Sequence, residues 1–134
     1  MTVSVLTNAV HVYKALGHPA RLRIVAMLRS GELCACQITA VLKLAPSTVS
    51  AHLAELRRAG LLTEHKDGRW IYYHLAQSED AVEIGESSWQ RVRRDPRIRS
   101  DAAVVRQLRA IPVEELCRRS LDVSPSTISP AGGA

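Results

Sequence analysis

Phenylalanine is absent from this sequence, and aromatic residues of all kinds make up only 4% of its 134 residues. The hydrophobic 46% must therefore build a core from aliphatic side chains, which favours packed helices over a β-sandwich. No apolar run is long enough to cross a bilayer, and the N-terminal segment lacks the charged start and cleavage site of an export signal. We therefore expect a small cytoplasmic protein with no membrane contact.

Cysteine is also scarce, with only Cys34, Cys36 and Cys117 in the chain. An odd number without an export signal argues against a disulfide framework, so we expect free thiols that serve as ligands in a reducing cytoplasm. The chain has no C-x-x-C motif and no evident Cys, His and Asp set, which argues against an enzyme. The formal net charge of +5 is compatible with a polyanionic partner such as nucleic acid.

Apolar periodicity predicts a mainly α-helical chain with one β-hairpin. The hairpin is placed by Asp67-Gly68, the strongest short turn signal, between two runs of strand-forming residues. We expect one domain over residues 1–94, a helical extension over 95–121 and a disordered Ser- and Pro-rich tail over 122–134. Helices are expected over residues 5–16, 19–29, 36–42, 47–59 and 78–94, then from residue 100 and over 112–121.

Two of these helices and the hairpin form the pattern of a winged helix-turn-helix. The second of the two follows a tight turn, is expected to be capped by Ser47, and carries no acid before Glu55. Such a helix can enter a major groove, while basic residues at the hairpin tip reach phosphates or a minor groove. The predicted DNA contacts are Ser47, Thr48, Ser50, Ala51, His52 and Arg57 on the helix, and Lys66 and Arg69 on the hairpin.

This stretch resembles the ArsR/SmtB family of bacterial metal-responsive repressors. The resemblance rests on the opening ELCAC, the recognition helix STVSAHL, the turn AGLL and the wing DGRWIYYHL, in roughly the first two-thirds of the chain. It implies a homodimer formed through the first and fifth helices, which represses from a palindromic operator and releases it when ligand binds. The family's zinc site on the fifth helix is not expected, because residues 78–94 contain no histidine.

Cys34 and Cys36 stand where a loop enters the helix before the recognition helix. The partial positive charge of a helix N-terminus is expected to lower their pKa and favour thiolates, which suit soft ions and metalloids. Two cysteines separated by one residue can reach one centre only if the backbone departs from a regular helix. Ligand binding is therefore expected to deform the start of this helix and to shift the recognition helix that it supports.

The resemblance implies that ELCAC supplies two thiolates to trivalent arsenic or antimony, As(III) or Sb(III). In arsenic-responsive members a third cysteine follows three residues later, where this chain has Thr39. Cys117 is the remaining candidate, from the same subunit or its partner, and two interpretations stay open. Either Cys117 completes a three-thiolate site, or it is a buried apolar residue and the two-thiolate site prefers a monomethylated arsenical.

Two alternatives for the function also stay open. One is a thiol redox-responsive repressor, in which Cys34 and Cys36 form a strained, easily reduced disulfide. The other is a winged helix that binds proteins rather than DNA. His18, His65 and His74 are scattered along the sequence and are interpreted as structural or surface residues.

Overall fold

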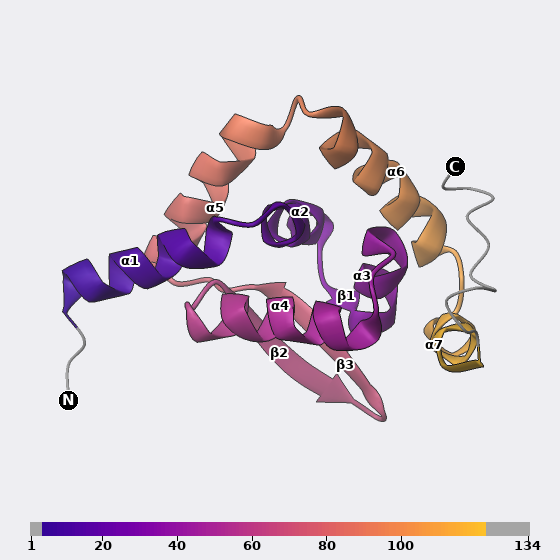
Figure 1. Ribbon diagram of the computed structural model, residues 1–134. Coiled ribbons are helices and arrows are strands. Elements are labelled where there is room, and N and C mark those ends of the chain that lie inside the picture. Colours follow the sequence, from indigo (N-terminus) through magenta and orange to yellow (C-terminus); the bar gives the residue numbers. More distant parts are fainter. Residues whose placement is uncertain (1–3, 123–134) are drawn as a thin grey trace.

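The computed structural model describes residues 4–122, in which a small antiparallel sheet lies at one edge of a helical body (Figure 1). This architecture confirms the predicted mainly α-helical winged fold with a β-hairpin. The predicted tail over residues 123–134 lies outside the described residues. The elements are α1 (Val5–Leu16), α2 (Pro19–Met27), the 3₁₀ helix η1 (Leu28–Ser30), β1 (Leu33–Cys34), α3 (Ala35–Leu42), α4 (Pro46–Arg58), β2 (Leu62–Asp67), β3 (Trp70–Leu75), α5 (Glu79–Val92), α6 (Pro96–Arg109) and α7 (Val113–Asp122).

The sheet has the strand order β1-β3-β2, and β3 is antiparallel to both neighbours. The β2–β3 turn closes at the pair Asp67↔Trp70, where Gly68 adopts a φ of 63°, a left-handed conformation that glycine reaches without strain. The Asp-Gly signal therefore placed the hairpin correctly. β1 adds only the pairs Leu33↔Tyr73 and Cys34↔Tyr72, which bring the first cysteine onto the edge of the wing.

Helix α4, the predicted recognition helix, begins one residue earlier than expected. Its first residue is Pro46 and Ala45 occupies the N-cap position, so the prediction that Ser47 caps the helix is wrong. Proline suits the first helical position because its ring fixes φ and its missing N–H would have had no partner there. Ser47 lies inside the first turn instead, with its side chain exposed.

Helix α6 also begins earlier than predicted, at Pro96 rather than near Ser100. Its N-cap is Asp95, whose carboxylate accepts a hydrogen bond from the Arg97 N–H at 2.8 Å. Asp101, expected near the start of the helix, lies within it and is buried. α5 and α6 arch over α2, and the chain then turns down to α7 beside α3 (Figure 1).

One hydrophobic core joins the DNA-binding elements to the rest of the molecule. α3 and α4 are in contact within it, and β2 contributes Leu62. The least exposed side chains of this core come from five different elements, so a shift of α3 must be accommodated by α4. They are Ile24, Leu33, Ile38, Val49, Leu53, Leu56 and Leu62. Within residues 4–122, no helix is both long and apolar enough to span a membrane.

Candidate thiol centre and nucleic-acid interface

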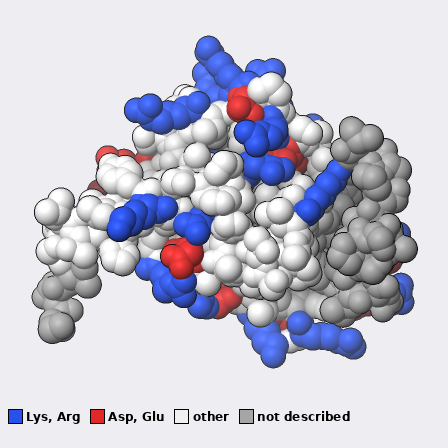
Figure 2. Space-filling model, in the orientation of Figure 1, with Lys and Arg blue, Asp and Glu red and all other residues white. Residues whose placement is uncertain are grey.

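The outer face of α4 and the hairpin tip present the side chains that a winged helix would use on DNA. Figure 2 shows Lys and Arg side chains at the lower edge of this face, where the β2–β3 hairpin ends, and others over α5 and α6. Arg57 is exposed but forms an ion pair with Glu64 on β2, which partly neutralises it. The other exposed residues of the predicted set are Ser47, Thr48, Ser50, Ala51, Lys66 and Arg69.

His52 is the exception, and the prediction that it lies on the exposed face of α4 is wrong. It is only 8% exposed, and its Nδ1 accepts a hydrogen bond from Arg21 Nε of α2 at 3.1 Å. Its ring also lies 4.4 Å from the ring of His18, which caps the start of α2. His52 therefore points inward and fixes the position of the recognition helix against α2.

The buried position of His52 predicts a pH dependence of stability. Burial lowers the pKa of His52 below its ordinary value, and the nearby His18 and Arg21 act in the same direction. The unfolded chain then takes up the proton more readily, so stability should be lost as pH falls below ~6.5. We expect His52→Asn, whose side-chain oxygen can still accept from Arg21, to weaken this decline in urea unfolding midpoints measured between neutral and mildly acidic pH.

The matched control is His11→Asn, because His11 is exposed on α1. It should leave the acid slope as in the wild type. Equal slopes for the His52→Asn variant and the wild type would contradict the assignment and place the acid sensitivity on other groups.

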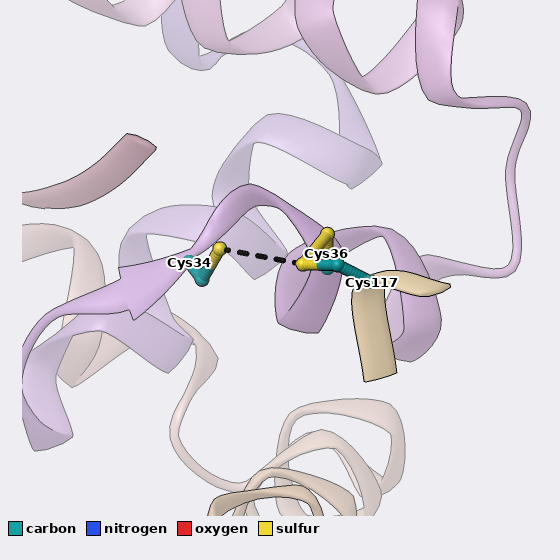
Figure 3. Close-up of side chains that lie close together, drawn as sticks. All are labelled: Cys34, Cys36 and Cys117. Atoms are coloured by element: carbon teal, nitrogen blue, oxygen red, sulfur yellow. Dashed lines mark hydrogen bonds between the residues drawn. A yellow bond between two sulfur atoms is a disulfide. The ribbon is translucent and has the colours of Figure 1, made fainter. Parts of the chain in front are cut away.

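The three cysteines come together in space (Figure 3). Cys34 is the N-cap of α3, Cys36 lies in its first turn, and Cys117 reaches them from α7. Cys36 and Cys117 form a disulfide with a Cα–Cα separation of 5.3 Å, and the Cys34 sulfur lies 3.9 Å from that of Cys117. The expectation that all three thiols are free is wrong here, because α7 lies against α3 and brings the Cα atoms within the usual disulfide range.

Cys34 and Cys117 are each only 1% exposed, whereas Cys36 is partly exposed. Burial raises the pKa of the Cys34 thiol, and hydrogen bonding with the backbone of Cys36 and Ala35 opposes this only in part. The prediction that the helix N-terminus lowers the pKa of this thiol is therefore wrong for Cys34, because desolvation outweighs the backbone. The Cys34 N–H donates to Gln37 Oε1 at 2.7 Å, which fixes the backbone at this position.

The sulfur positions fit a single soft centre. All three lie within 4.8 Å of one another. In a tetrahedral site with metal–thiolate bonds of about 2.3 Å, two sulfurs lie about 3.8 Å apart. Cys34 is already near that distance from Cys117, at 3.9 Å, so reduction of the disulfide need only let the Cys36 and Cys117 sulfurs separate. Thr39 takes no part, because its hydroxyl donates to the Ala35 carbonyl at 2.8 Å. In the described part of the chain, this cluster of potential ligands contains cysteines alone.

A second group of potential ligands was missed by reasoning from the sequence. Glu32, His65 and His74 each place one ligand atom within 4.8 Å of the others on the outer face of the sheet. The histidines are nine residues apart along the chain, and only the β2–β3 register brings them together. The sequence did contain one usable signal: the two histidines lie on either side of the Asp-Gly turn, at distances from it that place both side chains on the same face of the hairpin. That inference requires the exact length of the turn to be known.

Comparison with known proteins gives a consistent family. A profile described as "Bacterial regulatory protein, arsR family" matches residues 18–64. The arsenic resistance transcriptional regulator ArsR1 of Pseudomonas putida is 43% identical over 65 residues, which are 48% of this chain and 51% of that protein. This chain therefore spans about half the length of that relative. The arsenical resistance operon repressor of Escherichia coli is 36% identical over 84 residues, which are 60% of this chain and 72% of that protein.

Other relatives are not named for arsenic resistance. The cadmium resistance transcriptional regulatory protein CadC of Listeria innocua is 38% identical over 64 residues, which are 47% of this chain and 54% of that protein. Among solved structures, HlyU from Vibrio cholerae matches with a TM-score of 0.60 and 31% identity, over 66% of this chain and 96% of that one. These relatives are regulators rather than enzymes, and with its winged fold this chain belongs to the ArsR family of bacterial transcriptional regulators.

Proposed function

We propose that this protein represses transcription from a DNA operator in the cytoplasm and releases it when Cys34, Cys36 and Cys117 bind trivalent arsenic or antimony. The observation that carries the proposal is the meeting of three sulfurs, two from the β1–α3 junction and one from α7, within 4.8 Å. A trigonal pyramid of sulfurs is the preferred geometry of these metalloids. Arsenic resistance regulators among the relatives support the choice of inducer, while the cadmium regulator is the reason to test it.

The chemistry begins with reduction of the Cys36–Cys117 disulfide. Two electrons and two protons from a thiol reductant break the S–S bond and leave three thiols. Arsenous acid, As(OH)₃, then condenses with these thiols, so that three As–S bonds replace three As–O bonds and three water molecules leave. The partial exposure of Cys36 gives the incoming acid a first sulfur to meet, and the buried Cys34 and Cys117 would complete the set.

Binding at the start of α3 has a direct route to the recognition helix. Cys34 and Cys36 are separated by one residue at the N-terminus of α3, so binding of both sulfurs and of Cys117 to one centre acts directly on this first turn. Ile38 on α3 and Val49 and Leu53 on α4 lie in the same closely packed core. Because such cores respond by discrete repacking, a displaced α3 favours a different position of α4.

We also propose that the protein acts as a homodimer. α1 projects from the body of the molecule, and its outer end is free of Lys, Arg, Asp and Glu on the face seen in Figure 2. Its side chains Val5, Leu6 and Tyr13 are 88%, 77% and 71% exposed, and α5 adds Val82. Burial against a second copy would remove this apolar area from water and set two recognition helices on the two halves of a palindrome.

In such a dimer, α4 would lie in the major groove and the hairpin over neighbouring backbone. We assign base or phosphate contacts to the exposed residues of the predicted set, and a positioning role to the inward-facing His52. Phosphate contacts make binding weaken steeply with salt, which separates this proposal from a protein-binding winged helix. The assigned contacts are Ser47, Thr48, Ser50, Ala51, Arg57, Lys66 and Arg69.

The test is a fluorescence anisotropy titration of the reduced full-length protein against a DNA duplex that it selects from a random library. We expect salt-dependent binding that arsenite or antimonite reverses, while the Cys34→Ser and Cys36→Ser variants bind DNA and ignore both. Reversal by cadmium but not by arsenite would contradict the choice of inducer. A wild type that binds no duplex, or whose binding is indifferent to salt, would contradict the assignment as a DNA-binding repressor.

One observation favours a second function, in which the disulfide itself is the signal. Cys36 and Cys117 form the bond, and not the Cys34–Cys36 pair that the sequence suggested, so oxidation would tie α7 to α3. The same anisotropy assay distinguishes the two functions. Release on oxidation of the thiols, with no response of the reduced protein to arsenite, would support redox sensing in place of metalloid sensing.

A further inference from the structure

We propose that Glu32, His65 and His74 form a second metal site, on the wing, that binds a borderline divalent cation such as Zn²⁺. The three residues come from three different strands or their ends: Glu32 directly precedes β1, His65 lies on β2 and His74 on β3. Their ligand atoms all lie within 4.8 Å of one another. This site uses none of the three cysteines, so its ability to bind metal does not depend on metalloid sensing.

The register explains why these side chains share a face. Thr63 is opposite His74 and His65 is opposite Tyr72, so all four side chains project from the same side of the β2–β3 ladder. Leu33 is opposite Tyr73, which puts Glu32, one residue earlier, beside His74 on that side. The result is a row of side chains that can converge on one point above the sheet.

The contacts of the two imidazoles suit metal binding. His65 Nε2 lies 3.4 Å from Glu32 Oε2, and the ring of His74 is edge-on to that of His65 with centroids 5.6 Å apart. The Thr63 hydroxyl contacts a ring nitrogen of His74 at 2.8 Å, an outer contact of the kind that fixes ring orientation in metal sites. His65 stacks on Tyr72 with ring planes 15° apart, which restricts its rotation.

The donor set selects the class of cation. Two imidazoles and one carboxylate suit Zn²⁺, Co²⁺ or Ni²⁺, whereas Mg²⁺ and Ca²⁺ prefer oxygen ligands throughout. The side chains of His65 and Glu32 are 47% and 48% exposed, so water can occupy the remaining coordination positions and the ion can exchange.

Occupation of this site would join the start of β1 to the hairpin, two residues before Cys34. The protein would then bind a borderline cation at the wing and a soft metalloid at the thiols.

The test is an imidazole ¹⁵N NMR titration of untagged, full-length protein, kept in its disulfide form, with ZnSO₄. We expect the ring signals of His65 and His74 to shift and those of His11 and His18 to stay.

Matched variants make the result decisive. His74→Gln and Glu32→Gln should weaken Zn²⁺ binding at least about tenfold, and His11→Gln should not. Zn²⁺ should also raise the midpoint of thermal unfolding of the wild type but not that of His65→Gln, because a ligand stabilises the state that binds it. Unmoved His65 and His74 signals would overturn the proposal. So would uptake that persists in His65→Gln but is lost in Cys34→Ser, since the ion would then sit at the thiols.

Discussion

A Cys117→Ser variant is expected to keep its affinity for operator DNA and to need at least about 100-fold more arsenite for release. Removal of a group that only orients a metal ligand lowers metal affinity about 10- to 100-fold. Removal of a sulfur that itself binds the arsenic should lower the affinity by at least about 100-fold. Serine fills nearly the same volume at a residue that is 1% exposed, and α7 should therefore stay in place. The measurement is operator anisotropy against arsenite under reducing conditions.

A second substitution turns this loss into a rescue. Thr39 lies three residues after Cys36 on α3, so its side chain is on the same face of the helix, and it occupies the position where the family's arsenic-responsive members have their third cysteine. Cys117→Ser/Thr39→Cys should recover most of the arsenite response. Thr39→Ser in the same Cys117→Ser background is the matched control, because it keeps a hydroxyl that can donate to Ala35 but adds no thiol.

Three outcomes decide the role of Cys117. Recovery by the thiol alone supports a three-sulfur centre. An undiminished response of the Cys117→Ser single variant would make the site a pair of thiolates, and a monomethylated arsenical would become the better inducer. A failure of both double variants to respond, with DNA binding intact, would mean that release depends on α7 being pulled towards α3 and not on the number of sulfurs.

The parts of the fold that the sequence predicted correctly are those set by local signals. The period of apolar residues located the helices, and the Asp67-Gly68 turn located the hairpin, because both depend on neighbours within a few residues. The errors in helix starts have the same origin. Ser47 and Ser100 are good caps, but Pro46 and Pro96 restrict the preceding residue to extended backbone and begin each helix earlier.

Contacts between distant segments could not be derived in the same way. The sulfurs of Cys34 and Cys117 meet across 83 residues, and the amphipathic pattern of α7 shows that one face is buried without saying against what. His52 illustrates the reverse error: a histidine on a recognition helix suggested a DNA contact, whereas the partner that holds it, Arg21, lies 31 residues away on α2. Such pairings depend on tertiary packing, which no local pattern encodes.

An Asp101→Ala variant is expected to lose about 3 kcal/mol of stability, the lower end of what breaking a buried ion pair costs, since Arg23 keeps some contact with water. Arg23 Nε and Nη2 donate to the two oxygens of Asp101 at 2.8 and 2.9 Å. The side chains of Arg23 and Asp101 are 21% and 8% exposed, and the hydrogen bonding with Asp101 raises the pKa of Arg23. The measurement is urea unfolding, in which the midpoint should fall without a change of slope.

The matched control is Glu86→Ala on α5, which removes an exposed pair with Arg29 and should cost less than about 1 kcal/mol. The Arg23→Ala/Asp101→Ala double variant should be less destabilised than the sum of the single variants, because neither charge is then left buried alone. Additive losses, or a loss no greater than that of the control, would show that the pair carries little stability.

The functional consequence of losing Asp101 follows from its place in the chain. Asp101 fixes α6 to α2, and Arg109, at the far end of α6, donates to the Gly31 and Glu32 carbonyls just before β1. α6 leads directly into α7, which supplies Cys117. Asp101→Ala should therefore also weaken the arsenite response, through a third thiol that is less well positioned, while Glu86→Ala leaves it intact. A destabilised variant with a full arsenite response would mean that the disposition of α7 is set by its contacts with α3 alone.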